Sequence, residues 1–259
     1  MEKYLEEYDN YRSTIVYYFT YGSGGIGDML KYFMYLLAFC IKNKIQLKYF
    51  LNDYPISKFI KLKHEKMYEK SNSGEFVEIT HINQLSKLRT NVKYLVQPFI
   101  LYKISDISKY ISFSISNVFY FSKDITNMYN VIEPYNSIHL RLGDKFIETE
   151  SQYKACPDDI RDYDEERLVK YIRENPEKRM LFFCDNKSYK RRIKNKFPSI
   201  RIIDHDIGHT SYINITDKQM RNTIVDFYLI CKSDIIIAAS KSGFSEIASY
   251  FYKSPFLRI

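Results

Sequence analysis

The sequence of 259 residues contains no tryptophan and only 8 glycines and 7 prolines. So few glycines and prolines exclude a collagen-like or low-complexity chain, since those classes need far more of both. Long hydrophobic runs are also missing: residues 32–41, the longest nearly uncharged run, have about half the ~20 residues of a membrane span. The acidic start MEKYLEEYDN lacks the basic and then apolar order of a signal peptide. We therefore expect a globular, cytoplasmic protein without a membrane span.

Cysteines are scarce and widely spaced, and the four of them form no C-x-x-C pair. This spacing predicts reduced, inert thiols. The net charge of +8, with a pI near 9.0, is typical of nucleic-acid-binding proteins. It is equally typical of enzymes whose substrate or cofactor carries phosphates. Composition therefore leaves both classes open.

Predicted strands and helices alternate from Asn136 to the end of the sequence. The hydrophobic patterns predict strands at 136–142, 179–184, 200–204, 234–240 and 255–259, and helices at 164–174, 187–197, 217–232 and 244–252. Strands that alternate with helices of this length are typical of βαβ units in a parallel sheet covered on both faces.

The first half shows a similar but noisier pattern. A strand at 14–21, a glycine turn, a helix at 29–41 and a strand at 45–50 are followed by weaker strands near 76–80 and 92–96. We predict an α/β fold of two Rossmann-like domains, 1–130 and 131–259, which meet near Glu133 and Pro134. Ligands of such sheets bind at the carboxyl ends of the strands, so the segments that follow strands are candidates for the site.

The first such segment contains Gly22, Gly24 and Gly27 in a G-x-G-x-x-G pattern between a strand and a helix. This context favours an oxidoreductase that binds NAD(P) or a flavin. That reading needs an acidic residue at the end of the second strand, which here ends in Tyr49 and Phe50 with Asp53 beyond it. The alternative is a tight turn that needs glycines for its backbone alone. No lysine follows, which excludes a Walker-type phosphate loop.

A second segment, SIHLRLGD, places His139 and Arg141 on one face of a strand end. The fork of an arginine suits a phosphate and stays charged at any accessible pH. The alternative is an ion pair between Arg141 and Asp144 that closes a loop.

A third segment, SKSGFSEIASYF, brings small and hydroxyl residues to a helix start. Ser240, Ser242, Gly243 and Ser245 lie where unpaired backbone N–H groups favour an anion. The alternative role of Ser242 is an ordinary N-cap.

Two further patterns give weaker indications of function. His205, Asp206 and His209 have no additional ligand at a recognised metal spacing, so we expect no metal. The helix at 187–197 has a basic face, but no known nucleic-acid-binding motif accompanies it. A nucleic-acid-binding protein thus remains an alternative that explains the charge alone, and we expect no nucleic-acid partner.

Taken in order, these motifs resemble those of the fucosyltransferase superfamily, which includes the α1,2-, α1,6- and protein O-fucosyltransferases. GGIGDMLKYF (24–33) is similar to the glycine loop and helix of the α1,2 enzymes, and HLRLGD (139–144) to the H-x-R-R-x-D motif. SKSGFSEIASYF (240–251) is similar to the S-S-F-S motif, and LFFCDNKSY (181–189) to the strand and aspartate that precede it.

The resemblance implies a GT-B glycosyltransferase, whose two Rossmann-like domains face each other across a cleft. It implies a GDP-fucose donor, a glycan or glycoprotein acceptor, inversion at the anomeric carbon, and no metal or other cofactor. Arg141 falls on the donor-binding arginine. The other donor-side candidates are His139, Asp144, Asp185, Ser240, Ser242, Gly243, Phe244 and Ser245, and the acceptor-side loop holds Gly24, Gly25 and Gly27.

Some positions depart from the superfamily pattern. Leu142 replaces the second arginine, Gly243 replaces a hydroxyl residue, and Asp28 replaces an asparagine. We expect Asp28 to be the general base, because an inverting transfer needs a proton acceptor opposite the leaving nucleotide and a helix start keeps a carboxylate ionised. The alternatives are a helix cap for Asp28 and a base among other residues, such as Asp144 or His139.

Overall fold

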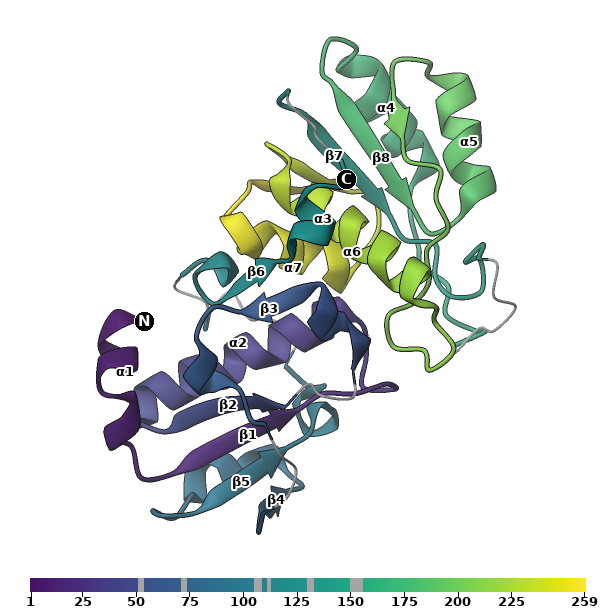
Figure 1. The fold of residues 1–259 in the computed structure, drawn as a ribbon. Coiled ribbons are helices and arrows are strands. Elements are labelled where there is room, and N and C mark those ends of the chain that lie inside the picture. Colours follow the sequence, from purple (N-terminus) through teal and green to yellow (C-terminus); the bar gives the residue numbers. More distant parts are fainter. Residues whose placement is uncertain (51–53, 71–73, 105–108, 111–112, 130–132, 150–155) are drawn as a thin grey trace. The chain divides into compact units, whose positions relative to one another are not determined.

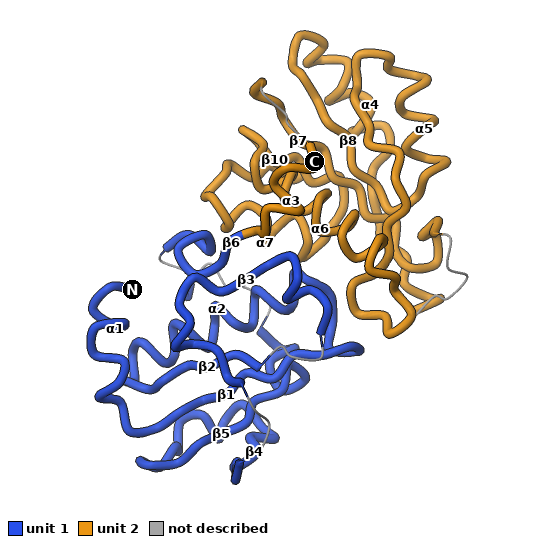
Figure 2. Tube along the Cα trace, viewed as in Figure 1, with its two compact units in different colours: residues 1–120 blue, residues 121–259 orange. Residues whose placement is uncertain are grey.

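The structure is a computed structural model that describes residues 1–50, 54–70, 74–104, 109–110, 113–129, 133–149 and 156–259 (Figure 1). The described chain divides into two compact units, Met1–Tyr120 and Phe121–Ile259 (Figure 2). The expected boundary between residues 130 and 131 lies outside the described residues. Phe121 already belongs to unit 2, because its ring packs against Phe251 at 4.5 Å and Tyr228 at 5.0 Å between centroids.

Unit 1 is built on a parallel sheet. Its elements are α1 (Glu2–Glu6), β1 (Thr14–Tyr18), α2 (Ile26–Asn43), β2 (Gln46–Phe50), β3 (Ile60–Leu62), β4 (Val77–Ile79) and β5 (Lys93–Val96), and β6 (Phe119–Phe121) spans the division. The sheet has the order β2–β1–β5–β4, and every pair in it is parallel. β3 and β6 form a separate two-stranded sheet, which the sequence patterns did not indicate.

The core of unit 1 lies between this sheet and α2. Helical spacing of apolar residues over α2 buries one face of it, including Leu30, Phe33 and Leu37. The ring of Tyr17 on β1 stacks on Tyr49 of β2 at 5.3 Å, and Phe33 contacts the same Tyr49 at 5.2 Å. Aromatic packing therefore fixes α2, and with it the glycine turn before it, against the carboxyl end of β1.

Unit 2 contains the second parallel sheet. Its elements are α3 (Lys123–Thr126), β7 (Asn136–Leu140), α4 (Glu165–Glu174), β8 (Met180–Cys184), α5 (Lys187–Lys196), β9 (Arg201–Ile202), α6 (Asp217–Lys232), β10 (Ile236–Ala238), α7 (Gly243–Tyr252) and β11 (Phe256–Arg258). The order is β11–β10–β7–β8–β9, and all pairs are parallel. This is the order of a doubly wound Rossmann sheet, which changes direction between β7 and β10.

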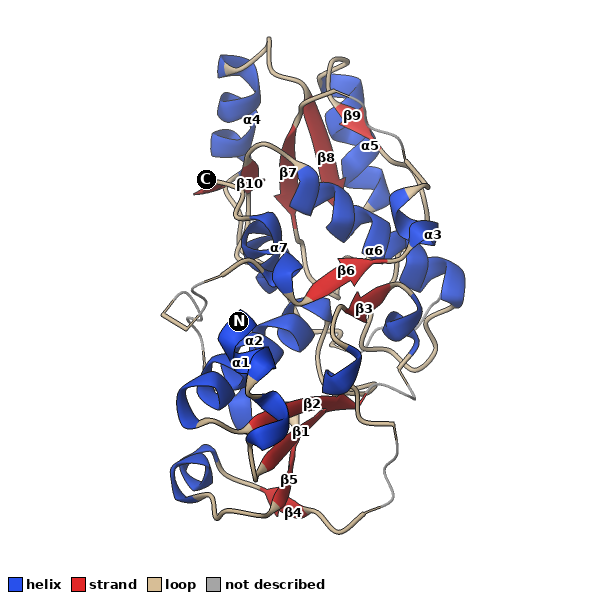
Figure 3. Cartoon of the chain, turned by 60° about the vertical axis from the view of Figure 1, so that its left-hand side comes forward, coloured by secondary structure: helices blue, strands red, loops and turns tan. Residues whose placement is uncertain are grey.

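Helices cover both faces of this sheet (Figure 3). α4 and α5 pack on one face, where Leu168 and Ile193 join a core with Ile138, Phe182 and Ile237. α6 and α7 cover the other face. All residues of β7 and β8 are buried, as expected for central strands of a parallel sheet.

The predicted α/β class with parallel sheets is confirmed, and the facing arrangement of two domains across a cleft stays a prediction. One difference matters for the site. The strand expected to reach residue 142 ends at Leu140, so Arg141 begins the loop after β7 rather than closing the strand. The backbone leaves the sheet there because the N–H and carbonyl of Arg141 bond to a side chain, Ser240, instead of to a neighbouring strand.

Candidate functional site

The point where the sheet of unit 2 changes direction brings two sequence-predicted segments together. Arg141 follows β7 and Ser240 follows β10, the strand next to it. The N–H of Arg141 donates to Ser240 Oγ at 2.9 Å, and that hydroxyl donates to the carbonyl of Arg141, also at 2.9 Å. Ser240 therefore joins the two strand ends, at the place where doubly wound sheets bind their ligands.

The guanidinium of Arg141 lies among three carboxylates. It pairs with Asp144, its Nε lies 3.4 Å from Asp185 Oδ2, and a third oxygen, from Asp159, lies 3.9 Å from Nη2. The side chain is 18% exposed. Burial alone lowers the pKa of Arg141, but the carboxylates outweigh it and the net pKa is raised. Arg141 is thus a fixed positive charge with a small open face.

Asp185, at the end of β8, holds the backbone of this loop. Its two carboxylate oxygens accept the N–H groups of Leu142 at 2.8 Å and Gly143 at 3.0 Å. Burial raises its pKa, although Arg141 and the two N–H groups act against the shift. Because it is 4% exposed and already engaged, Asp185 holds the arginine loop in this structure.

A segment that the sequence patterns did not single out closes the loop from the other side. Gly143 has a φ of +103°, and a Cβ there would lie 2.3 Å from the carbonyl oxygen of Asp159. The carboxylate of Asp159 accepts the N–H of Asp144 at 3.3 Å and pairs with Arg161 Nε at 2.8 Å. Only glycine permits this approach.

Tyr212 was also missed from the sequence. Its hydroxyl donates to Asp144 Oδ2, the carboxylate that pairs with Arg141. The ring of His209 stacks on Tyr212 at 4.7 Å between centroids. Burial and then the positive charge of Arg141 lower the pKa of His209 to about 4. No local pattern marks Tyr212, because it lies in the long connection between β9 and α6, and His209 was singled out only as a possible metal ligand.

His139, which we expected to face the ligand with Arg141, packs inward instead. It is 6% exposed, and its ring stacks on Phe244 of α7 at 5.3 Å. Burial, followed by the charge of Arg141, lowers the pKa of His139 to about 3. His139 still belongs to β7, whereas Arg141 follows the strand. The neutral, buried ring of His139 therefore packs between β7 and α7 and fixes the helix against the strand.

The helix α7 starts beside this loop. Ser242 is the N-cap, and its Oγ accepts the N–H of Phe244 at 3.3 Å. Ser245 is fully buried and its hydroxyl donates to the carbonyl of Ser242 at 3.4 Å, so it stabilises the turn from inside. A Cβ on Gly243 would meet no heavy atom within 4 Å, which leaves room above the first turn. The helix start therefore presents backbone N–H groups, as an anion site requires.

Asp28 and the acceptor-side glycines lie in unit 1. Gly25 is the N-cap of α2, so Asp28 is the third helical residue rather than the cap itself. Its carboxylate accepts the N–H of Gly25 at 3.3 Å and lies 3.4 Å from Lys31 Nζ. Gly24 has a φ of +109°, and a Cβ there would lie 2.7 Å from Asp28 Oδ2. The side chain of Asp28 is 40% exposed.

The residues weighed as metal ligands have other partners. His205 Nε2 lies 2.8 Å from Asp226 Oδ1, and Asp206 pairs with Lys187 at 2.8 Å. Within the described residues, no group of three or more ligand-type side chains gathers around one point. The described helices also include none that is long and apolar enough to cross a membrane.

The basic helix α5 is engaged by its own unit. Lys190 is buried and donates to the carbonyl of Ile203 at 2.8 Å. Arg191 pairs with Asp204 and Arg192 with Glu165. These basic side chains therefore have partners within unit 2.

We compared the sequence and the structure with known proteins. No protein-family model matches the sequence, and no curated protein matches it. The structure is similar to NodZ, an α1,6-fucosyltransferase from Bradyrhizobium soaked with GDP-fucose, with a TM-score of 0.56 and 10% identity over 93% of this chain and 92% of that chain.

Two further solved structures agree. A mutant of FUT1 from Arabidopsis thaliana in complex with GDP has a TM-score of 0.58 and 8% identity, over 99% of this chain and 73% of that chain. POFUT1 in complex with GDP has a TM-score of 0.57 and 12% identity, over 95% of this chain and 98% of that chain. Likeness at such identities is a likeness of fold alone: the chain shares the fold of these fucosyltransferase structures.

Proposed function

We propose that this protein is a glycosyltransferase that transfers fucose from GDP-fucose to a hydroxyl of a glycan or glycoprotein, with inversion and without a metal. Unit 2 binds the nucleotide sugar and unit 1 receives the acceptor. GDP-fucose is the specific proposal within the wider class of GDP-sugars. We also propose a cytoplasmic location, which suits four free cysteines, three of them buried.

One observation carries the proposal: Arg141 and the start of α7 meet where the sheet of unit 2 changes direction. The leaving group of fucosyl transfer is a diphosphate, and a site without a metal must stabilise its charge with fixed positive groups. Arg141 supplies a guanidinium and α7 supplies backbone N–H groups, and Ser240 connects the two strand ends that hold them. Three solved structures that share the fold are named as complexes with GDP or GDP-fucose.

The proposed reaction is a single displacement at C1 of fucose. The acceptor oxygen forms a bond to C1, while the bond from C1 to the β-phosphate oxygen breaks and its electron pair leaves with GDP. The proton of the acceptor hydroxyl passes to Asp28, which an exposed carboxylate at a helix start permits. Asp144 is less suited to this role because it is paired with Arg141 and bonded to Tyr212, and His139 is buried.

The three carboxylates around Arg141 set a condition on donor binding. Arg141 and Arg161 are two positive charges, against the three negative charges of Asp144, Asp159 and Asp185. A diphosphate must therefore compete for the N–H groups of Arg141 rather than meet an unopposed cation. We expect GDP to bind more tightly as salt falls, but less steeply than at a purely basic site.

Calorimetry with GDP, GDP-fucose, NADH and NADPH tests the donor class. The proposal expects heat with GDP and GDP-fucose and none with the dinucleotides. Binding of NADH without binding of GDP would instead favour the oxidoreductase, for which Gly22, Gly24 and Gly27 provide the loop. In that alternative the acidic residue would be Asp53, which lies outside the described residues. β2 itself ends in the buried Tyr49 and Phe50 and has no acidic side chain.

A transfer assay then tests the sugar and the acceptor. Radiolabelled GDP-fucose and GDP-mannose are supplied in parallel over a glycan array, with and without a chelator. Transfer of fucose alone, unchanged by the chelator, is the expected result. Transfer that stops on chelation would remove the metal-free part of the proposal, and transfer of mannose alone would replace the donor.

A further inference from the structure

Unit 1 contains a cavity of about 660 Å³ at the end of the sheet opposite the glycine turn. Three segments form its wall: the residues before β1, the end of α2 with the residues that lead into β2, and the residues before β5. These are the amino ends of parallel strands, whereas the glycine turn follows the carboxyl end of β1. At a rise of ~1.5 Å per residue, Asp28 and Lys42 lie about 21 Å apart along α2.

Four positive side chains surround this cavity: Arg12, Lys42, Lys44 and Arg89. All four are exposed, and no acidic residue is among the described residues that line the cavity. None of the four forms an ion pair within the described residues. Elsewhere in unit 1 the pattern is different, since Lys66 pairs with Asp9.

Helix electrostatics accounts for only half of this cluster. Lys42 and Lys44 lie at the carboxyl end of α2, where the helix dipole favours positive charge. Arg12 and Arg89 come from the other two segments and gain nothing from that dipole. Four like charges around one cavity repel each other, so their gathering costs stability until an anion is bound.

Hydrogen bonds hold the backbone segments that carry these positive side chains. Ser13 Oγ donates to the carbonyl of Arg89 at 3.1 Å, and the N–H of Arg89 donates to the hydroxyl of Tyr94 at 2.7 Å. Lys44 ends α2 in the left-handed conformation, with a φ of 53°. The backbone that carries the positive side chains is therefore fixed by buried or partly buried groups, while their charged ends reach solvent.

The rest of the wall indicates the kind of anion. Tyr11 and Phe39 offer aromatic surface, and Asn10, Asn43 and Ser86 offer neutral hydrogen-bonding groups. Single-stranded nucleic acid needs a groove that follows its backbone over several nucleotides, whereas these charges surround one compact cavity. A saccharide fits better, because its hydroxyls match the neutral polar groups and its acidic groups match the cations.

We propose that this cavity binds an acidic saccharide, one that carries two or more sulfate, phosphate or carboxylate groups, at a site separate from the donor site of unit 2. The choice of a saccharide rests on the glycosyl transfer proposed above, whereas the anion site itself does not. The site would hold an acidic glycan while another part of it reacts.

Binding is measured directly, without nucleotide, by calorimetry on the full chain. The probes are a sulfated heparin tetrasaccharide, a galacturonate trisaccharide, neutral maltotetraose and a thymidine oligonucleotide. We expect both acidic saccharides to bind, more weakly as salt rises, and maltotetraose to give no heat. Absence of binding by both acidic saccharides would overturn the proposal, whatever the result with GDP.

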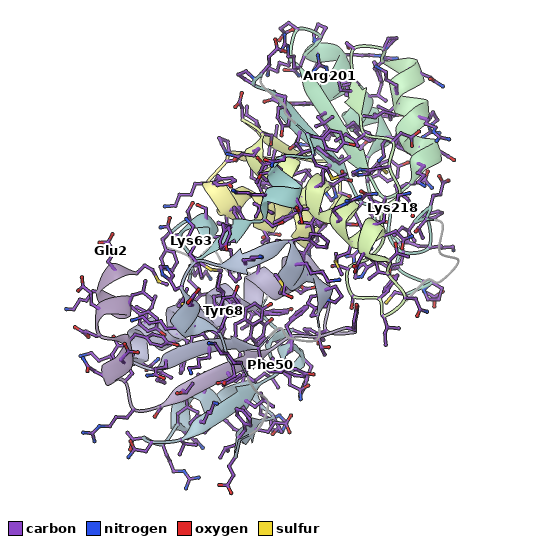
Figure 4. All side chains as sticks on the ribbon, in the orientation of Figure 1. Glu2, Phe50, Lys63, Tyr68, Arg201 and Lys218 are labelled. Atoms are coloured by element: carbon purple, nitrogen blue, oxygen red, sulfur yellow. The ribbon has the colours of Figure 1, made fainter. Side chains whose placement is uncertain are left out.

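The double variant Arg12→Gln/Arg89→Gln tests the location, and we expect a loss of about tenfold in affinity for the acidic saccharides. Lys63→Gln/Lys218→Gln removes the same charge at two exposed positions outside the cavity (both labelled in Figure 4) and should change affinity less than twofold. An equal loss of affinity in both variants would mean that the saccharides bind through the overall positive charge of the protein, and it would overturn the proposal.

Three further measurements complete the test. Circular dichroism checks that the arginine variant is folded, and Lys42→Gln, at an exposed helix end, gives a second loss of affinity from a wall segment that holds neither arginine. Arg141→Ala should leave binding of the acidic saccharides unchanged, because Arg141 belongs to unit 2. If Arg141→Ala abolishes it, or if the oligonucleotide binds more tightly through Arg12 and Arg89, the assignment is wrong.

Discussion

The loops that follow β1 and β7 occupy the same place in two parallel sheets but are built from different chemistry. The turn after β1 is made by glycines, and its charged groups are one carboxylate, Asp28, and its neighbour Lys31. The loop after β7 is made by Arg141 and the carboxylates that surround it. The loop after β1 thus exposes backbone, whereas the loop after β7 holds a concentrated set of charges.

Under the proposed function, the two loops bind different ligands. An open backbone turn lets a bulky, neutral molecule such as a glycan approach closely. A fixed guanidinium beside a helix start suits a diphosphate. Four predictions test this contrast, in order of decreasing effect.

The largest effect is expected for Arg141→Lys. The variant keeps the positive charge but loses the planar fork, so kcat for fucosyl transfer should fall on the order of 10²–10³-fold. Steady-state rates with GDP-fucose, on protein whose thermal unfolding matches the wild type, provide the measurement. Near-normal turnover in folded Arg141→Ala would remove this residue from the mechanism.

Asp28→Asn tests the glycine turn that follows β1. Asparagine still accepts the N–H of Gly25 but has no basicity, so the rate of transfer should fall about 10²-fold. Wild-type rates across the whole pH range would show that Asp28 only stabilises the start of α2.

Gly143→Ala tests the close backbone approach in the arginine loop through the free energy of unfolding. A Cβ there would lie 2.3 Å from a backbone carbonyl oxygen in a left-handed conformation, and we expect a loss of about 1–3 kcal/mol in the free energy of unfolding. Gly243→Ala is the matched control: it has room for the Cβ and should be neutral or stabilising by about 0.5–1 kcal/mol. Urea unfolding of both variants decides, and equal stability for the two would contradict the strained approach at Gly143.

The smallest expected effect concerns acid. The pKa of His139 is lowered to about 3 in the folded protein, against 6.5 for an ordinary histidine, so the unfolded chain binds more protons between these values. The stability from the neutral ring is complete above pH 6.5 and is lost as the pH falls toward 3. His139→Phe keeps the stack on Phe244 but does not titrate, so its unfolding free energy should fall less from pH 7 to pH 5.

Urea titrations at the two pH values provide this measurement. His81→Phe, which changes an exposed side chain of unit 1, is the control and should follow the wild type. A His139→Phe slope equal to that of the wild type would mean that His139 is charged in the folded protein.

Local patterns were enough to predict most of the fold. α6 runs from Asp217 to Lys232 as expected, because Thr216 and Gln219 form a capping box at its start. The arginine loop and the start of α7 were also found in sequence, since each follows an apolar strand directly. Asp159 and Tyr212 were not, because they reach Arg141 from long connections whose residues show no periodicity.

Side-chain direction was the other limit. His139 and Arg141 were expected on one open face, but the strand ends at Leu140, and alternation holds only within a strand. Asp185 was predicted as a donor-side candidate, but its bonds to the loop backbone were not, because they depend on how β8 lies beside β7. Such details follow from tertiary packing and not from any pattern in the sequence.

The bond between Arg141 and Ser240 has a consequence for how the protein is made. It connects residues 99 positions apart in the chain, so it forms only after β8, β9 and α6 have been synthesised and β10 has reached its place beside β7. Contacts of such long sequence separation carry a large loop-closure entropy and form slowly. During synthesis, Arg141 therefore leaves the ribosome well before Ser240, and the proposed donor site is completed among the last parts of unit 2.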